Sequence, residues 1–433
     1  MASPAPRIRM IATDSTAAAN AAPHVLFISY DGMTDPLGQS QVLPYLTNLA
    51  KRGYRITLLS TEKPERFEQH RATIEAIVQK AGITWEYIFF RRKPPGLAKF
   101  FDLRELKQKA LSIHRRTPLD MTHCRSYVSA AVGLMLKRKF GIKMLFDMRG
   151  FWVDERVDGG IWNLRNPVFR YAYRQYKQKE ASYIAAADGI ISLTENGKQE
   201  IQTWPAYKGA PITVIPCSTD FDLFPLIDRA QRAQGKAELG IPNNDLVISY
   251  LGSVGGWYLL DDMLRQFWVI KQQFPTARML FITQDSKEEI LAAARKLEGL
   301  REEDFLVRAA TRQQVPKLLA ASDINLFFIK QSYSKKASSP TKLGEILAMG
   351  IPVICNAGVG DVESIIRDTD GGIAIPELTE AWLQKAAAQV PQLLAKDPET
   401  LRRNAQPYYD LGRAVASYEQ QYARILNRKA AKA

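Results

Sequence analysis

The sequence predicts an α/β protein built from two doubly wound, Rossmann-like domains that face each other across a cleft. Short apolar segments alternate with amphipathic helical segments, a pattern typical of parallel sheets covered by helices. This alternation pauses at a polar, helix-prone stretch, residues 222–245, and then starts again. A chain of 433 residues is also too long for one ordinary core. Ligands are expected at the carboxyl ends of the strands, in the cleft.

The elements can be placed in order from residue 24. The first buried strand is expected at residues 24–30, and an amphipathic helix at 41–52 ends at Gly53. The segment Met121–Tyr127 is expected to follow another short strand. The remaining strands of the first domain are expected at 55–60, 85–90, 143–146, 189–193 and 212–215, and those of the second at 246–251, 278–282, 324–328, 351–355 and 372–375. We therefore expect an N-terminal domain over 24–222 and a C-terminal domain over 223–411.

The composition is that of an ordinary globular protein, with 46% hydrophobic and 24% charged residues. No apolar run approaches the roughly 20 residues that cross a bilayer. Residues 1–23 are rich in Ala, Ser, Thr and Pro without a continuous apolar segment, so we expect a disordered leader rather than a signal peptide. Cys124, Cys217 and Cys355 are far apart and odd in number, which suits a reducing cytosol. The four histidines form no cluster, and no metal is expected.

The net charge of +14 is concentrated in the first half of the chain. There the aromatic-rich run from Trp85 to Phe101 contains four cations, Arg91, Arg92, Lys93 and Lys99. Aromatic residues beside cations suit an anionic membrane surface. A buried strand that ends in a solvated basic loop is the alternative, and single-stranded nucleic acid fits least well. We expect a cytoplasmic protein, peripheral at the inner face of the membrane, with no nucleic-acid partner.

The most informative segment runs from Ser338 to Ile354. Its small, hydroxyl and cationic residues stand at a loop-to-helix junction, where unpaired backbone amides and the helix dipole suit a phosphate. Lys342 can follow a diphosphate, and Glu345 can accept hydrogen bonds from sugar hydroxyls. These features predict a nucleotide-diphosphate site. The alternative is a helix whose polar start serves only as a cap.

Four segments resemble the retaining glycosyltransferases of family four, which have the GT-B fold. They are Ala187–Glu195, Val214–Phe224, Ala321–Leu326 and Pro340–Ile354. The resemblance implies transfer of a hexose from a nucleotide-diphosphate sugar to a hydroxyl of a glycan or lipid-linked oligosaccharide acceptor. It also implies retention of the anomeric configuration without metal or cofactor. The N-terminal domain would bind the acceptor and the C-terminal domain the nucleotide sugar, and a helix at about 412–433 would return to the first domain.

The donor site that the resemblance implies departs from the family pattern at three positions. Ala337 replaces the first of two glutamates, and Ser253 and Tyr258 replace a basic pair that clamps the diphosphate. The phosphates would then be held by Lys342, by Lys335 or Lys336, and by backbone amides of the glycine-rich loop at residues 252–258. The Ser-Pro-Thr-Lys variant resembles a subgroup found in bacterial polysaccharide clusters. The expected donor-binding residues are Gly252, Ser253, Gly255, Ser339, Pro340, Thr341, Lys342, Glu345 and Glu363.

Acceptor and catalytic residues are expected after the strands of the first domain. The loop with Asp35, Gly38 and Gln39 would touch the diphosphate or the acceptor, or would simply cap a helix. Asp147 could orient the sugar or take the acceptor proton, and Arg149 could stabilise the leaving diphosphate. These two could instead form a buried structural pair. His123 could bind a sugar hydroxyl or be satisfied structurally.

Two other functions remain open at this stage. A nucleotide-sugar 2-epimerase shares the two-domain fold and would consume the donor without an acceptor. A non-catalytic scaffold in a polysaccharide assembly complex is prompted by Ala337 and by the missing clamp residues, and it predicts weak donor binding.

Overall fold

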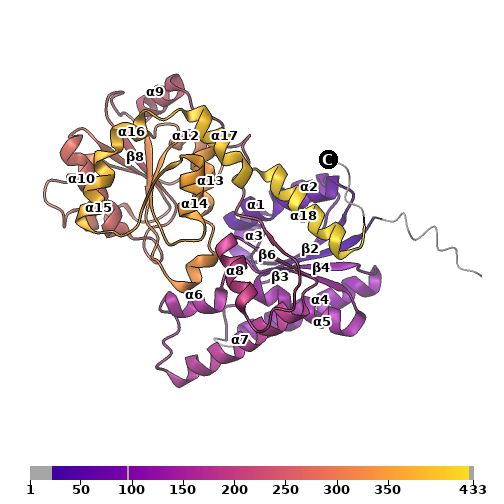
Figure 1. The fold of residues 1–433 in the computed structure, drawn as a ribbon. Coiled ribbons are helices and arrows are strands. Elements are labelled where there is room, and N and C mark those ends of the chain that lie inside the picture. The colour runs from indigo at the N-terminus through magenta and orange to yellow at the C-terminus, as the bar shows by residue number, and fades with distance from the viewer. Residues whose placement is uncertain (1–21, 95–96, 429–433) are drawn as a thin grey trace, which may run out of the picture.

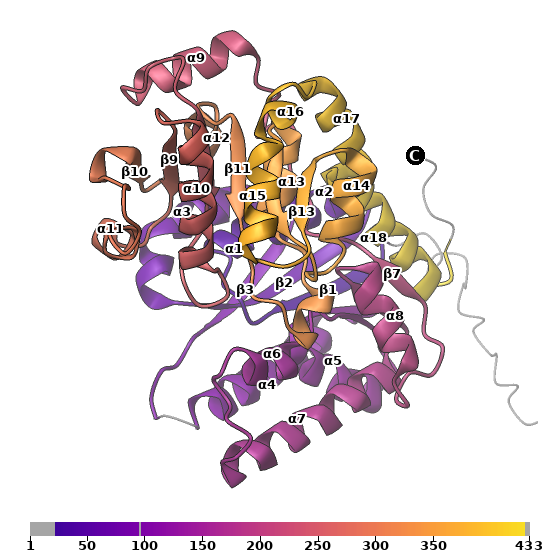
Figure 2. The same ribbon diagram turned by 60° about the vertical axis from the view of Figure 1, so that its left-hand side comes forward.

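The computed structural model describes residues 22–94 and 97–428, which form two domains, each with one parallel sheet covered by helices (Figures 1 and 2). The N-terminal sheet has the order β3 (Thr84–Phe89), β2 (Arg55–Glu62), β1 (His24–Ser29), β4 (Met121–Arg125), β5 (Lys143–Asp147), β6 (Gly189–Ser192), β7 (Ile212–Val214). The C-terminal sheet has the order β10 (Phe305–Arg308), β9 (Arg278–Ile282), β8 (Val247–Leu251), β11 (Ile324–Phe327), β12 (Val353–Asn356), β13 (Gly372–Ile375). In both sheets the strand order reverses direction at the first strand, which confirms the predicted doubly wound class.

The helices alternate with these strands along the chain. Those before β8 are α1 (Pro36–Gln41), α2 (Leu43–Lys51), α3 (Pro64–Lys80), α4 (Ala98–Arg116), α5 (Ser126–Phe140), α6 (Trp152–Asp158), α7 (Pro167–Ala186), α8 (Glu195–Thr203) and α9 (Arg229–Glu238). Those after β8 are α10 (Leu260–Gln273), α11 (Lys287–Ala294), α12 (Val315–Leu319), α13 (Thr341–Ala348), α14 (Val362–Thr369), α15 (Glu380–Ala388), α16 (Val390–Leu394), α17 (Pro398–Tyr409) and α18 (Leu411–Ile425). Two short 3-10 turns, η2 (Glu302–Asp304) and η3 (Tyr333–Ala337), complete the list.

Both faces of the N-terminal sheet are buried, because successive side chains of a strand point to opposite sides. In β1, Val25 and Phe27 belong to a core shared with α2, α3 and α18, whereas Leu26 and Ile28 belong to a core shared with α4, α5 and α7. The buried run of β1 is therefore continuous rather than alternating, as expected for a central parallel strand.

The chain crosses between the domains twice. Ile215 lies in the N-terminal core and Phe224 in the C-terminal core, so the first crossing occurs between them. At the second, the backbone amide of Thr219 donates to the carbonyl of Tyr409 at 2.7 Å. Helix α18 then returns to the N-terminal domain and packs beside α2, as the yellow end of the ribbon in Figure 1 shows.

Two strands differ from the sequence prediction. Met121–Arg125 was expected to follow a strand but is itself the central strand β4. Its polar residues hide the strand pattern, because they are buried by neighbouring layers rather than exposed. Strand β10, at the edge of the second sheet, was not predicted. The proposed leader lies outside the described residues, apart from residues 22 and 23, and so does the end of the proposed last helix, residues 429–433.

Candidate active site

A cleft of about 470 Å³ lies between the two domains. Several of the residues that line it lie just after the carboxyl ends of strands. Asp31 follows β1, Ser126 follows β4, Arg149 follows β5 and Leu193 follows β6. The second domain contributes Ile329 after β11, together with other residues of its loops. The cleft therefore occupies the position where open parallel sheets bind ligands.

Two residues at this edge have a left-handed backbone conformation that is uncommon outside glycine. Ser126 has a φ of 68° and Arg149 a φ of 58°. They follow the adjacent strands β4 and β5, and both line the cleft. Such conformations cost about 1–3 kcal/mol each and persist where the surrounding structure holds them, often at functional sites. The strain marks this edge as a candidate site independently of any side-chain chemistry.

The side chains that line the cleft carry an excess of positive charge. Among the described residues, its wall contains one carboxylate, Asp31, and five cations: Lys99, Arg125, Arg149, Arg156 and Lys335. Arg125 donates to Asp31 at 2.6 Å and is almost fully buried. Lys335 pairs with Glu155 of α6 at 2.9 Å. Neither Arg149 nor Arg156 forms an ion pair within residues 22–94 and 97–428, although the charge of Arg149 also acts on the buried Asp147. Both guanidinium groups can therefore attract an anionic ligand in the cleft.

The segment from Ser338 to Ile354 begins with a loop-to-helix junction at the cleft, as predicted. Helix α13 starts at Thr341 with Pro340 as its N-cap, and Ser339, Pro340 and Thr341 line the cleft. The Ser339 hydroxyl accepts a hydrogen bond from the backbone amide of Cys217 at 3.2 Å, which ties this turn to the interdomain crossing. The free backbone amides of the first turn are thus held beside the cations of the cleft.

Lys342 does not line the cleft but lies beneath the glycine-rich loop after β8. Its side chain is buried, with Nζ 3.2 Å from the hydroxyl of Tyr250 and 3.8 Å from the centroid of the Tyr258 ring. Burial lowers the pKa of Lys342 well below its ordinary value of 10.5, with the Glu345 carboxylate opposing this shift. A Cβ on Gly252, where φ is 119°, would lie 3.0 Å from Nζ, so glycine allows the lysine to approach the loop.

The rest of this loop separates into a cleft-facing part and a solvent-facing part. Trp257 and Tyr258 line the cleft. Ser253 and Gly255 are exposed, and the carbonyl of Ser253 accepts a hydrogen bond from the Tyr250 hydroxyl. The predicted site residues Gly252, Ser253 and Gly255 therefore shape the loop, whereas the aromatic pair forms its wall.

Glu345 is held by an arginine that the sequence did not point to. Its carboxylate accepts from Arg312 at 2.6 Å, and neither side chain lines the cleft. Burial raises the pKa of Glu345 above its ordinary value of 4.5, and the charge of Arg312 opposes this shift. Glu345 is thus positioned on α13 but already has a partner.

Glu363 is exposed at the start of α14 and does not line the cleft, but its neighbour Asp361 joins the two domains. The Asp361 carboxylate accepts from the backbone amides of Glu195 at 2.6 Å and Asn196 at 3.0 Å, at the beginning of α8. This helix end of the N-terminal domain is therefore capped by a residue of the other domain.

The predicted loop after β1 is turned differently from our expectation. Asp35 pairs with Lys63 at 2.9 Å and Arg66 at 3.2 Å on the side of α3. Gln39 donates to the carbonyl of Thr34 at 3.2 Å. Gly38 does allow a close approach, but to its own chain, because a Cβ there would lie 2.2 Å from the carbonyl oxygen of Gly32. In their place, Asp31 and Leu37 face the cleft.

His123 and Asp147 lie in the interior of the N-terminal domain rather than in the cleft. The His123 ring nitrogens lie 2.6 Å from the Tyr422 hydroxyl and 3.3 Å from an Asp147 oxygen. Tyr418 also donates to Asp147 at 3.1 Å. Burial lowers the pKa of His123. Burial opposes ionisation of Asp147, but the charges of Arg149 and His123 lower its pKa overall.

This geometry favours the structural alternative for His123 and Asp147, because neither side chain lines the cleft in the structure. Asp147 is the last residue of β5 itself, so its side chain is fixed by the pleat of the sheet against α18. Arg149, two residues later, is the member of the predicted catalytic group that does reach the cleft. Its guanidinium also donates to the Cys217 sulfur at 3.3 Å.

Ala337, where the family pattern has its first glutamate, packs into the N-terminal domain. It is buried with the core beside α8, and its Cβ would lie 3.0 Å from a Cβ added to Gly197. The turn η3 that carries it makes further contacts with the N-terminal domain, since Tyr333 and Lys336 both reach Glu200 of α8 at 3.0 Å. The two domains are therefore in close contact at this position.

Of the four cations expected at a membrane, two have roles within the fold. Arg91 pairs with Asp102 at 3.0 Å and with Glu105 at 2.5 Å, and Lys99 lies over Trp152 at the cleft. Arg92 is exposed beside Glu65 at 3.5 Å, and Lys93 is exposed. Across residues 22–94 and 97–428, no helix is long and apolar enough to cross a membrane, and no group of three potential metal ligands occurs.

Sequence reasoning missed Asp31, Arg125, Trp257 and Arg312. Asp31 stands in the loop that was singled out, so only the turn geometry was unknown. Arg125 was missed because the prediction placed residues 121–127 after a strand, whereas Arg125 is the last residue of strand β4. Arg312 follows the unpredicted strand β10 and reaches Glu345 from 33 residues away in the chain. No local signal could have found that contact.

Comparisons with known proteins agree with this architecture. The sequence model of Glycosyltransferase Family 4 matches residues 39–223, and that of Glycosyl transferases group 1 matches residues 231–406. No curated protein matches the chain in a sequence search. Solved structures with a similar fold include a glycosyltransferase from Rickettsia africae ESF-5, with a TM-score of 0.68 and 14% identity over 94% of this chain and 100% of that one.

Two further structures with a similar fold were solved with ligands bound. HepE of Anabaena, in complex with UDP and glucose, has a TM-score of 0.65 and 13% identity, covering 93% of this chain and 99% of that one. The UDP-GlcNAc 2-epimerase of Neisseria meningitidis, bound to UDP-GlcNAc, has a TM-score of 0.55 and 12% identity, covering 93% of this chain and 100% of that one. At such identities these structures show the fold alone. With both halves of the chain matched by glycosyltransferase models, the protein belongs to the family-four glycosyltransferases and has the GT-B fold.

Proposed function

We propose that the protein transfers a hexose from a nucleotide-diphosphate sugar to a hydroxyl of a glycan or lipid-linked oligosaccharide, with retention of the anomeric configuration and without a metal ion. The observation that carries this proposal is the charge of the interdomain cleft, with five cations and one carboxylate beside the start of α13. Two phosphate groups are the natural complement of such a surface. The UDP held by the similarly folded HepE makes UDP sugars the first donors to test.

In this proposal the cleft residues act mainly by electrostatic stabilisation. Arg149 and Arg156 would stabilise the negative charge that develops on the departing diphosphate. The amides at Thr341 and in the loop after Gly252 would add donors, with the charge of Lys342 behind that loop. Asp31 is the carboxylate that faces the cleft, so it would orient the acceptor hydroxyl. The contacts of η3 and Asp361 would keep the domains closed and exclude water.

Thermal-shift titration with UDP, GDP, ADP and their common sugar conjugates tests the donor site. A ligand that binds only the folded state raises the melting temperature by mass action. We expect a shift with one nucleotide that is lost in Arg149→Ala and reduced in Glu345→Ala, while Arg308→Ala, an exposed residue of β10, leaves it unchanged. A shift that survives Arg149→Ala would contradict the assigned phosphate contact.

The finer parts of the proposal need separate measurements. Proton NMR of the freshly formed product gives the anomeric configuration, and an inverted product would overturn retention. Transfer in the presence of EDTA tests metal independence. Conversion of the donor to its C2 epimer without acceptor would establish the epimerase alternative. No binding of any nucleotide would favour the scaffold alternative, which Ala337 and the missing clamp residues motivate.

We also propose that the protein is cytoplasmic and acts at the inner face of the membrane. The exposed side chains at the beginning of α4 support this, since Leu97 is 56% and Phe100 59% exposed, and the cations Arg92 and Lys93, a few residues earlier in the sequence, are exposed too. Co-sedimentation with anionic vesicles should be lost when Leu97 and Phe100 are changed to Ser. Equal binding of neutral and anionic vesicles would contradict a role for the cations.

A further inference from the structure

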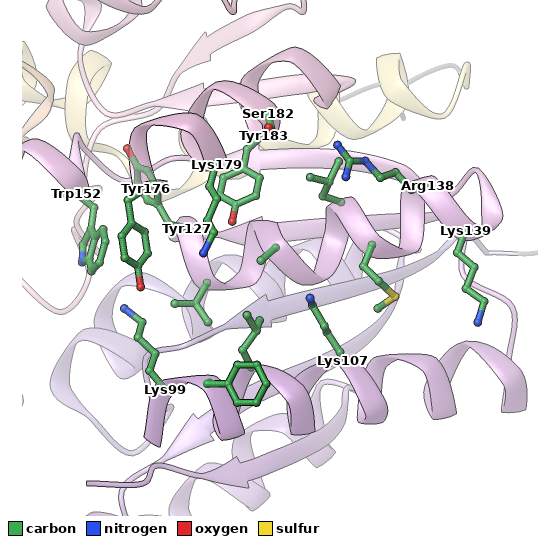
Figure 3. Close-up of a pocket in the computed structure, with 16 residues that line it drawn as sticks. Lys99, Lys107, Tyr127, Arg138, Lys139, Trp152, Tyr176, Lys179, Ser182 and Tyr183 are labelled. Atoms are coloured by element: carbon green, nitrogen blue, oxygen red, sulfur yellow. The ribbon is translucent and has the colours of Figure 1, made fainter. Parts of the chain in front are cut away.

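A second, larger cavity lies in the N-terminal domain next to the active-site cleft. It has a volume of about 780 Å³ and is formed by α4, α5 and α7. In Figure 3, Lys99 and Lys107 of α4 and Lys179 of α7 point into the space between these helices, with Tyr127 of α5 behind them. We call this cavity the α4–α7 groove.

The α4–α7 groove combines an apolar floor with a basic rim. Its floor is made by Leu103, Val128, Ala131, Leu134 and Met135, and the exposed Phe100 also lines it. Its cations are Lys99, Lys107, Arg138, Lys139 and Lys179, and no carboxylate of the described residues lines it. Within residues 22–94 and 97–428 none of these five forms an ion pair.

The groove is continuous with the cleft. Lys99, Tyr127, Val128 and Trp152 line both cavities. The Lys99 ammonium lies 4.3 Å from the centroid of the Trp152 ring. Burial lowers the pKa of Lys99 to about 8, with smaller contributions from the charges of Arg156 and Lys179. A cation that is both partly buried and surrounded by like charges gains from an anion placed at this junction.

We propose that the α4–α7 groove binds the lipid phosphate portion of an amphipathic acceptor, with the hydrocarbon chain on the apolar floor and the phosphate at Lys99 and Lys179. This inference rests on the proposed function, because it names the acceptor class of the same site. A saccharide joined to a lipid through phosphate has three parts in a fixed order. The order of the surfaces is the same: the cleft for the sugar, the cationic junction for the phosphate, and the groove for the chain.

The surroundings of the groove suit a ligand that comes from a bilayer. Figures 1 and 2 both place the beginnings of α4 and α7 at the same end of the N-terminal domain. There Leu97 and Phe100 are exposed, and Val168 and Tyr171 of α7 are 68% and 67% exposed. Large exposed apolar side chains grouped at one end mark an interaction surface. The lipid would enter the groove from this end without leaving an apolar environment.

Binding of farnesyl diphosphate to the full-length protein tests the proposal, measured by isothermal titration below its micellar concentration and with UDP present to fill the cleft. Farnesol and inorganic pyrophosphate are the matched half-ligands. We expect farnesyl diphosphate to bind at least tenfold more tightly than either, because charge-assisted contacts and apolar burial both contribute. Equal binding of farnesol, or of pyrophosphate, would overturn the proposal in favour of a merely apolar cavity or a general anion site.

Two variants locate the binding in the groove. Lys179→Glu changes an exposed residue and should weaken farnesyl diphosphate about tenfold or more while leaving farnesol nearly unaffected. Ala131→Trp should fill the floor and weaken both, with circular dichroism showing that the variant is folded. Lys80→Glu, an exposed residue on α3 at the opposite face of the sheet, is the charge-matched control. If Lys179→Glu and Lys80→Glu lower affinity equally, the effect is one of net charge and the proposed site is wrong.

The same proteins separate this proposal from the proposed function. Nucleotide binding that is intact in every variant, together with no binding of farnesyl diphosphate, would refute the groove and leave the glycosyltransferase site standing. Binding of farnesyl diphosphate without binding of any nucleotide would refute the donor site instead. Wild type and Ala131→Trp should transfer the sugar to a soluble glycan at an equal rate, whereas only wild type should transfer it to a lipid-linked acceptor. This result would support both the glycosyltransferase function and the lipid-binding groove.

Discussion

The ammonium group of Lys342 lies 3.8 Å from the centre of the Tyr258 ring and has no carboxylate partner within the described residues. A buried cation whose neighbours are aromatic rings is costly in the free protein. The proposed function gives a reason for this cost, because it assigns phosphate binding to the loop in front of Lys342, and stability is often given up for such a charge.

Lys342→Met should therefore raise the free energy of unfolding at pH 7 by about 1 kcal/mol or more. Because burial lowers the pKa of Lys342, the unfolded chain binds one more proton between that lowered value and 10.5, and wild-type stability rises with pH across this window. The advantage of the variant should shrink as the pH approaches 10.5. Urea unfolding at several pH values measures this difference in stability. A Lys342→Met variant that is less stable than wild type at pH 7 would contradict the view that burying Lys342 is costly.

Arg312→Ala should destabilise the protein by about 3–5 kcal/mol, because it leaves the Glu345 carboxylate buried without its partner. The sign with pH follows from the raised pKa of Glu345. A carboxyl group whose pKa is raised by folding contributes most to stability below its unfolded pKa of 4.5. It loses that contribution as the pH rises through its pKa in the folded protein. The deficit of the variant should thus be small in acid and grow toward neutral pH. Equal losses at pH 4 and pH 7 in urea titrations would refute it.

Asp361→Ala should loosen the contact between the domains, because two backbone amides at the start of α8 lose their acceptor. We expect a larger radius of gyration in small-angle X-ray scattering and a higher KM for the donor. Asp368→Ala, an exposed carboxylate of the same helix, is the control. An unchanged radius together with an unchanged KM would show that the cap does not hold the domains.

His123→Ala should lower the free energy of unfolding by about 2–4 kcal/mol, since Tyr422 and Asp147 lose a buried partner. Burial lowers the pKa of His123 below 6.5, so wild-type stability should fall as the pH drops from 6.5 toward that value, and the variant should lack this slope. Nucleotide affinity should be unchanged while the variant is folded. A normal stability with abolished transfer would instead restore the catalytic hypothesis.

Much of the fold follows from sequence periodicity, and part of the site does too. The continuous apolar run of β1 and the Ser339–Thr341 junction are local signals, and both are found where they were expected. Asp147 and His123 were expected to follow strands, but they lie within β5 and β4, where the pleat points them inward. Arg312 reaches Glu345 only through tertiary packing. Such contacts depend on how loops close, which periodicity does not encode.

The return of α18 to the first domain has a consequence for biosynthesis. Tyr418 and Tyr422 complete the core around His123, so the part of this sheet face that α2 and α3 do not cover stays open until α18 has been synthesised. A nascent chain that has already formed the C-terminal domain would still carry this open face. Chaperone occupancy during translation should persist until α18 has emerged, and a product truncated before residue 411 should aggregate rather than accumulate as two finished domains.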